Sequence, residues 1–249
     1  MSYNPKIQKE NLALIEKINH VFLGTRDFRS LADQTVKLIV EEVKGEGIVS
    51  AAIFRVHTKD KSLYAYSYAS RSFGIVDKLF PKRFSELNVS LSEETNLLVK
   101  TLSTREAQES NRLYDFSRPA LTERTANAIQ KVMGFGYAIA YPLRMRQGKV
   151  AGVVLFGVSG GKIEDQQRVL LDAFRLQLEL AFENVTEFEY VVERYKRSIA
   201  KTFTKTHEEN IPTVRLTLRI TPKQNILLEK RAMEKGMDKT SFIRSLIEE

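Results

Sequence analysis

The last part of the chain holds a strand-like segment that cannot form a core alone, and this constrains the fold most. Val214 to Ile220 alternate apolar and polar side chains, so a β-strand there places the apolar set on one face. Thr221 and Pro222 provide a helix N-cap and a first helical residue. Gly236 suits a left-handed C-cap, and Asp238 caps a second helix. A single strand with two short helices has too little apolar surface for an independent core.

A second copy of this segment completes the packing. Two strands pair in antiparallel order, and four helices then pack on one face of the two-stranded ribbon. The predicted dimer core is Leu216, Leu218 and Ile220. The opposite face, predicted to read bases, is Arg215, Thr217 and Arg219. A two-stranded ribbon fits the major groove of double-stranded DNA, where arginine donates to guanine and threonine contacts a base edge or a thymine methyl group.

The start of the second short helix is the other predicted DNA contact. The first backbone amides of a helix lack intrahelical partners and attract anions. We therefore expect a DNA phosphate at Lys239, Thr240 and Ser241. A polyanionic partner also agrees with the net charge of +8, and with the segment Glu193–Lys205, which has one acidic and five basic residues.

These features resemble the ribbon-helix-helix family of DNA-binding proteins, which includes the Arc, MetJ and CopG repressors. The resemblance rests on the alternating strand, the Thr-Pro helix start, the stretch Gly236 to Ser241, and Phe242-Ile243. It implies that the three outward strand residues read bases and that the second helix anchors the DNA backbone. Asn225 departs from the pattern, because the family usually keeps a nearby position apolar.

Two other interpretations of the ribbon stay open. An arginine–threonine–arginine stripe also occurs on strands that only meet solvent, and the ribbon then serves dimerisation in a protein-interaction adaptor. In the other interpretation, the protein is an antitoxin-like regulator that binds a second protein. The agreement of strand, helix caps and basic segment favours a sequence-specific, dimeric transcriptional regulator.

Residues 7–190 have the pattern of a separate α+β domain. The helices expected from apolar spacing are Ile7–Phe22, a segment from Asp27 or Ser30 to Val43, Asn96–Leu102, Thr125–Met133 and Glu164 to about Ala200. The expected strands are Ile48–His57, Leu63–Ala69, Tyr137–Met145 and Val150–Val158. Ser72–Ser90 and Ser103–Leu121 read as irregular. Strand pairs between helices indicate an antiparallel sheet with flanking helices.

The stretch from Gly136 to Phe156 resembles the GAF family, a small-molecule-sensing and dimerising fold. It has a strand with a Pro-Leu pair, a tight turn and a hydrophobic–Gly–hydrophobic strand in the family's order. Leu31–Val43 and Ile48–Ala69 also follow that order. The resemblance implies a pocket for a small-molecule or protein ligand between the sheet and the middle segment, roughly Phe73 to Met133.

The sequence lacks the residues that several kinds of chemistry require. The chain has no cysteine, which excludes disulfides, thiolate metal sites, a cysteine nucleophile and covalent bilin attachment. Phosphate loops, nucleophile elbows and zinc-protease motifs are absent, and the family's cyclic-nucleotide signature is not evident. His20, His57 and His207 are isolated, and the charged residues between Arg105 and Arg124 read as a solvated surface. We expect neither an enzyme nor a bound cofactor or metal.

The sequence pattern does not identify the residues that would bind a ligand. Tyr64, Tyr66 and Tyr68 alternate and would share one strand face, where they line a pocket or form ordinary core or surface. We also expect a cytoplasmic protein without a membrane partner, because the polar segment Met1–Glu10 has no signal region and no apolar run nears about 20 residues.

The predicted organisation has three parts. Residues 7–190 form the GAF-like sensing or dimerisation domain, residues 191–211 a helical connector and linker, and residues 212–249 the ribbon-helix-helix domain. Apolar residues at helical spacing in Glu187–Ala200 suggest a coiled-coil seam between two copies. A ligand of the first domain would then alter how the ribbon is presented to DNA.

Overall fold

The computed structural model describes residues 28–42, 46–145, 148–203 and 221–248. The chain divides into two compact units, Met1–Glu183 and Asn184–Glu249. The helix expected at Ile7–Phe22 lies outside the described residues, and so does the strand at Val214–Ile220. That strand carries all six residues predicted for base reading and the dimer core: Arg215, Leu216, Thr217, Leu218, Arg219 and Ile220.

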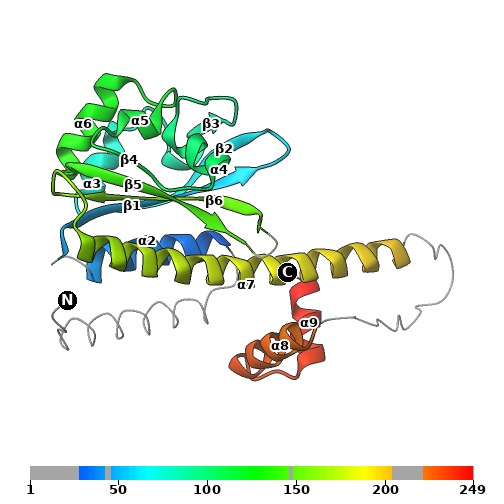
Figure 1. The fold of residues 1–249 in the computed structure, drawn as a ribbon. Helices are drawn as coiled ribbons and strands as arrows, with labels where there is room; N and C mark the ends of the chain where they lie inside the picture. Colours follow the sequence, from blue (N-terminus) through cyan, green and yellow to red (C-terminus); the bar gives the residue numbers. More distant parts are fainter. Residues whose placement is uncertain (1–27, 43–45, 146–147, 204–220, 249) are drawn as a thin grey trace, which may run out of the picture. The chain divides into compact units, whose positions relative to one another are not determined.

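A six-stranded antiparallel sheet forms the centre of the first unit (Figure 1). In chain order the strands are β1 Ile48–His57, β2 Ser62–Ser70, β3 Asn88–Ser90, β4 Gln108–Ser110, β5 Tyr137–Arg144 and β6 Val150–Val158. Their spatial order is β3-β2-β1-β6-β5-β4, so the hairpins β1–β2 and β5–β6 meet through β1 and β6. The expected antiparallel α+β domain is confirmed.

Helix α2 (Phe28–Glu42) and the first half of the long α7 (Asp165–Phe203) cover one face of this sheet (Figure 1). The ring of Phe28 stacks on that of Phe182 with centroids 4.1 Å apart, and it meets Tyr66 of β2 edge-on at 4.9 Å. The helix expected from Glu164 is thus confirmed. The apolar side chains proposed for its later coiled-coil seam lie outside the described ones.

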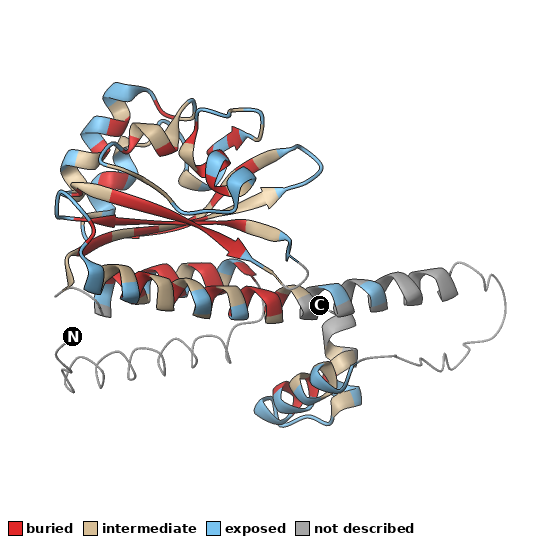
Figure 2. Cartoon of the chain, in the orientation of Figure 1, coloured by how far each residue is buried: buried red, intermediate tan, exposed pale blue. Residues whose placement is uncertain are grey.

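A layer of short helices covers the opposite face. It consists of α3 Phe73–Val76, η2 Asp77–Leu79, η3 Phe84–Glu86, α4 Leu97–Thr104, α5 Tyr114–Ser117 and α6 Glu123–Met133. Figure 2 shows that the buried residues concentrate on the sheet and on the sides of the helices that face it. The segments expected to be irregular therefore contain three-residue edge strands and single helical turns, which are too short to show a periodicity.

Asn96 ties this layer together. Its Oδ1 accepts hydrogen bonds from the amides of Leu98 at 2.8 Å and Val99 at 3.3 Å, which caps α4. Its Nδ2 donates to the carbonyl oxygen of Phe116 at 3.0 Å, at the end of α5. A side chain that is fully buried thus satisfies polar groups of two helices at once.

A β-bulge interrupts the pairing of β1 with β2. Phe54 pairs with Ala65 and Ile53 with Ser67, so Tyr66 has no opposite residue. The extra residue reverses the alternation of side chains beyond it. Ala65 and Tyr68 therefore both face the layer of short helices, whereas the ring of Tyr66 packs on Phe28 of α2.

The described part of the second unit includes two short helices, α8 (Pro222–Glu234) and α9 (Lys239–Glu248). Thr221 and Gln224 form a capping box at the start of α8, with Pro222 in the first turn. Gly236, with φ of 62°, allows the left-handed turn after α8. The predicted caps are confirmed. The helices share a small core of Leu228, Ala232 and Phe242, with Ile243 packed against it.

Within the described ranges, no helix has the length and apolar content that crossing a membrane requires.

Candidate functional site

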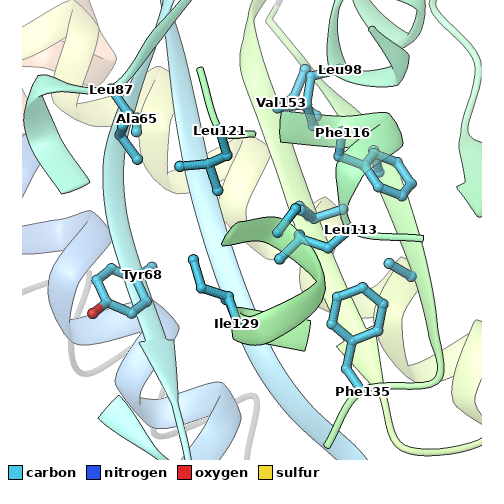
Figure 3. Packing of buried hydrophobic residues seen from close by; sticks show 14 of the residues in the cluster. Ala65, Tyr68, Leu87, Leu98, Leu113, Phe116, Leu121, Ile129, Phe135 and Val153 are labelled. Atoms are coloured by element: carbon cyan, nitrogen blue, oxygen red, sulfur yellow. The ribbon is translucent and has the colours of Figure 1, made fainter. Parts of the chain in front are cut away.

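A cavity of about 70 Å³ lies between the sheet and the short helices of the first unit (Figure 3). Its walls come from β1, β2 and β6 on one side and from α4, α5 and α6 on the other. The lining residues labelled in Figure 3 are Ala65, Tyr68, Leu87, Leu98, Leu113, Phe116, Leu121, Ile129 and Phe135. None of the described residues that line it is charged. This is the place where the GAF resemblance implies a pocket.

Aromatic rings close one side of the cavity. Tyr68 stacks on Phe73 at 4.9 Å and lies 4.5 Å from the ring of Phe84. Phe80 and Phe84 are 5.4 Å apart, and Phe54 of β1 meets Phe84 at 5.9 Å. Phe73, Phe80 and Phe84 lie on the segment of single helical turns between β2 and β3. This aromatic cluster forms a wall built from side chains rather than from a paired strand.

Three residues with a hydroxyl group, Ser50, Tyr68 and Ser117, belong to the lining. The Tyr68 hydroxyl donates to Asp77 Oδ1 at 3.0 Å, and burial together with this bond raises the pKa of Tyr68 far above its usual value, so the phenol stays neutral. Ser117 Oγ is buried and has no hydrogen-bond partner among the residues that the structure describes. Among the buried side-chain atoms without a partner, Ser117 Oγ is the one that belongs to a residue of the described lining.

The three alternating tyrosines do not share one face. The bulge at Tyr66 places Tyr68 on the cavity side, whereas Tyr66 packs under α2. Tyr64 donates to Asp60 at the exposed hairpin turn. The expectation of a single tyrosine stripe is wrong, because strict alternation does not allow for an inserted residue.

The charged residues between Arg105 and Arg124 include side chains that pair with one another or with α7. Arg112 forms an ion pair with Glu123, and Glu109 accepts from Arg168 of α7 at 2.5 Å. His57 Nδ1 lies 2.9 Å from Asp60 at an exposed turn. Among the described residues, no cluster of side chains suits a metal ion.

The start of α9 has intramolecular partners for the groups that we expected to meet a phosphate. Asp238 Oδ1 accepts from the amides of Thr240 and Ser241, both at 2.9 Å. The Ser241 hydroxyl donates to Asp238 Oδ2, and these bonds lower the pKa of Asp238. The capping carboxylate thus already occupies two of the amides that attract anions at a helix start.

Lys239 also has partners within the helix pair. Its Nζ lies 2.6 Å from Asn225 Oδ1 and 2.9 Å from Glu229 Oε1. The ammonium group and Asn225 together lower the pKa of Glu229. The three predicted phosphate-binding residues are adjacent as expected, and two carboxylates, Asp238 and Glu229, lie beside them.

Sequence reasoning missed the groups that distinguish this cavity. Ser117 sits in a four-residue helix, and Asp77 in a three-residue helical turn, where no periodic signal exists. The carboxylate beside the predicted phosphate site is the exception, because the sequence pattern itself predicts Asp238 as the cap of α9.

The fold of the first unit matches solved GAF structures. The GAF domain of a phosphoenolpyruvate-protein phosphotransferase from Acinetobacter has a TM-score of 0.52 and 12% identity, covering 76% of this chain and 98% of that one. A putative GAF sensor protein from Burkholderia vietnamiensis has a TM-score of 0.51 and 12% identity, covering 75% and 96%. A free methionine-R-sulfoxide reductase from Neisseria meningitidis, solved with its substrate, has a TM-score of 0.52 and 12% identity. That match covers 75% of this chain and 96% of the other.

No protein-family model matches the sequence. No curated protein matches it either. Identities near 12% define the fold alone, and the chain accordingly has a GAF-like α+β domain.

Proposed function

We propose that this protein is a dimeric, sequence-specific DNA-binding regulator that responds to a small molecule bound in its GAF-like domain. The helix pair α8–α9 carries the proposal: its capping box, its left-handed turn at Gly236 and its Asp238 cap follow directly on the alternating strand pattern. All of these features belong to a ribbon-helix-helix module. The GAF-like domain supplies a cavity for the signal.

The small core of the helix pair supports dimerisation. Among its described residues, the buried apolar cluster consists of Leu228, Ala232 and Phe242. Ile226 and Met233 on α8 are 65% and 80% exposed. A second copy of the same module would cover such side chains and pair the two strands, which supplies the missing apolar burial.

The long helix offers a further contact between copies. Val169, Leu176 and Leu180 of α7 are exposed and share one side of the helix, because they are spaced by seven and four residues. The buried Leu170, Phe174 and Leu178 lie on another side. An apolar stripe of this kind suits the same stripe of a second helix.

The proposed DNA contact uses the strand face Arg215, Thr217 and Arg219 to read bases. At the start of α9 the phosphate would meet the Lys239 ammonium group and the exposed Thr240 hydroxyl, since Asp238 already occupies the amides. The GAF-like domain acts by binding and not by catalysis, in agreement with a cavity lined by apolar side chains.

Selection of bound fragments from random double-stranded DNA by the full-length protein tests the proposal. We expect one preferred sequence with two half-sites, and an affinity that falls steeply as salt concentration rises. The double variant Arg215→Ala/Arg219→Ala should lose the preference but remain dimeric in sedimentation. A dimer that selects no sequence would instead support the protein-interaction adaptor.

A further inference from the structure

We propose that the cavity of the GAF-like domain takes an uncharged, compact aromatic molecule with one hydrogen-bonding group, and that Ser117 binds this group. Phenol is the simplest molecule of this class. The inference rests on the proposed ligand-sensing function, and it names the ligand chemistry from the lining residues of this chain. Charge, size, wall composition and the buried hydroxyl of Ser117 each restrict the ligand.

The lining excludes ions. The described residues around the cavity include no acidic or basic side chain. An anion or cation placed there would lose its hydration without gaining a counter-charge, which is strongly unfavourable in an apolar interior. Amino acids, nucleotides and carboxylates are therefore poor ligands for this cavity.

The volume restricts the ligand to a small molecule. The cavity measures about 70 Å³, whereas an engineered protein cavity of about 150 Å³ is known to bind benzene. A six-membered ring thus needs a modest enlargement. The aromatic cluster provides it, because Phe80 and Phe84 are only partly buried, Phe80 directly after the helical turn η2 and Phe84 in the turn η3. Rotation of these rings enlarges the cavity without breaking a strand pair.

The walls favour a flat ring. Phe54, Tyr68, Phe84, Phe116 and Phe135 all contribute to the lining. Aromatic rings attract one another edge-to-face or in offset stacks, beyond the gain from buried area. A flat aromatic ligand would join the contacts that already connect Tyr68 with Phe84.

Ser117 supplies the polar anchor. Its Oγ is buried without a hydrogen-bond partner among the described residues, whereas the Tyr68 hydroxyl is already bound to Asp77. A buried hydroxyl without a partner is unfavourable, and a ligand hydroxyl would relieve this. The Ser117 hydroxyl thus favours a ligand that carries a hydrogen-bonding group.

The test titrates the full-length protein with three probes while methyl NMR signals are recorded. The probes are phenol, toluene, which has a methyl in place of the hydroxyl, and benzoate, which adds a charge. We expect phenol and toluene to shift the methyl signals of Leu113, Leu121 and Ile129. Phenol should bind about two- to tenfold more tightly than toluene, the gain typical of one hydrogen bond. Benzoate should leave these signals unchanged.

Two variants separate the anchor from the cavity. Ser117→Ala should bind phenol no more tightly than toluene, because the ligand hydroxyl is then buried without a partner, and the affinity for toluene should be unchanged. Ala120→Leu adds volume at a lining position and should weaken both probes. Equal binding of benzoate and phenol would overturn the proposal, and so would an undiminished preference for phenol in Ser117→Ala, or the absence of methyl shifts with every probe.

These outcomes are independent of DNA binding. Phenol binding at the cavity methyls without sequence-selective DNA binding would leave this inference intact and remove the proposed regulator. Sequence-selective binding without any probe in the cavity would do the reverse.

Discussion

Lys239 Nζ donates a hydrogen bond of 2.6 Å to Asn225 Oδ1, and this bond joins the start of α9 to the first half of α8. Asn225 Nδ2 in turn donates to Glu229 Oε1 at 2.8 Å, an oxygen that Lys239 also contacts. Asn225, which lies near a position that ribbon-helix-helix proteins usually keep apolar, thus has a defined role. It links the two helices outside their small apolar core.

Replacing Lys239 with Met should raise the pKa of Glu229 towards its ordinary value of 4.5. A carboxyl whose folded-state pKa is lowered stabilises the fold above its unfolded value, and this contribution is lost as the pH falls through the folded value. The wild-type helix pair should therefore lose stability below about pH 4.5 more steeply than the variant. NMR titration of the Glu229 side chain measures the pKa directly. Lys235→Met is the control, and an unchanged Glu229 pKa in Lys239→Met would refute the prediction.

Asp238→Asn should strengthen DNA binding if the start of α9 faces a phosphate. Asparagine caps a helix as well as aspartate does, so the helix stays intact while the negative charge disappears. The expected gain is about two- to fivefold in affinity, the range of a single charge near a helix terminus. Fluorescence anisotropy with labelled DNA measures it. Glu234→Gln, which removes an exposed acid from the end of α8, should have less effect. Equal affinities of wild type and Asp238→Asn would place the phosphate elsewhere.

Arg219→Ala should relax sequence choice and cost about 1–3 kcal/mol on the preferred site, as expected for an arginine that reads a base. Arg194→Ala removes a charge from the basic segment of α7 and should weaken binding to every sequence by a similar factor. Gel-shift titrations with the preferred and a scrambled site compare the two variants. If Arg219→Ala binds the preferred site as wild type does, the strand does not read that base.

Gly152→Ala should destabilise the GAF-like domain by about 1–3 kcal/mol or more. Gly152 lies on β6 and pairs with Arg55, and a Cβ atom there would stand 2.0 Å from the carbonyl oxygen of Phe54. The backbone of two central strands would have to separate. Gly161→Ala is the matched control, since a Cβ there meets nothing within 4 Å. Urea denaturation followed by circular dichroism compares the variants, and equal midpoints would contradict the close approach.

The features that sequence predicted well are those set by local chemistry. The strand Val150–Val158 and the caps at Thr221, Gly236 and Asp238 follow from alternation, hydroxyl capping and glycine conformation. These depend on residues a few positions apart, so the sequence itself contains the whole signal.

The features that the sequence did not predict depend on residues far apart in the chain. Asn96 satisfies the carbonyl oxygen of Phe116, 20 residues away, and nothing near either residue indicates the contact. Residues of β2 and α6, which are far apart in the chain, line the same cavity. Ser117 lines it from a helix of four residues, which is shorter than any periodic pattern. The hydrogen bond from Lys239 to Asn225, 14 residues earlier, also joins residues whose neighbours in the sequence do not indicate the contact.

The bulge at Tyr66 inserts one extra residue into β2, and this shifts the alternation of side chains in the cavity wall by one position. A register slip that paired Tyr66 with Ile53 would restore a regular ladder between β1 and β2 without removing a residue. It would also exchange the environments of Ser67 and Tyr68, bringing the serine hydroxyl into the cavity and sending the phenol ring beneath α2. A change of register at this point would therefore alter the lining of the cavity without replacing any side chain.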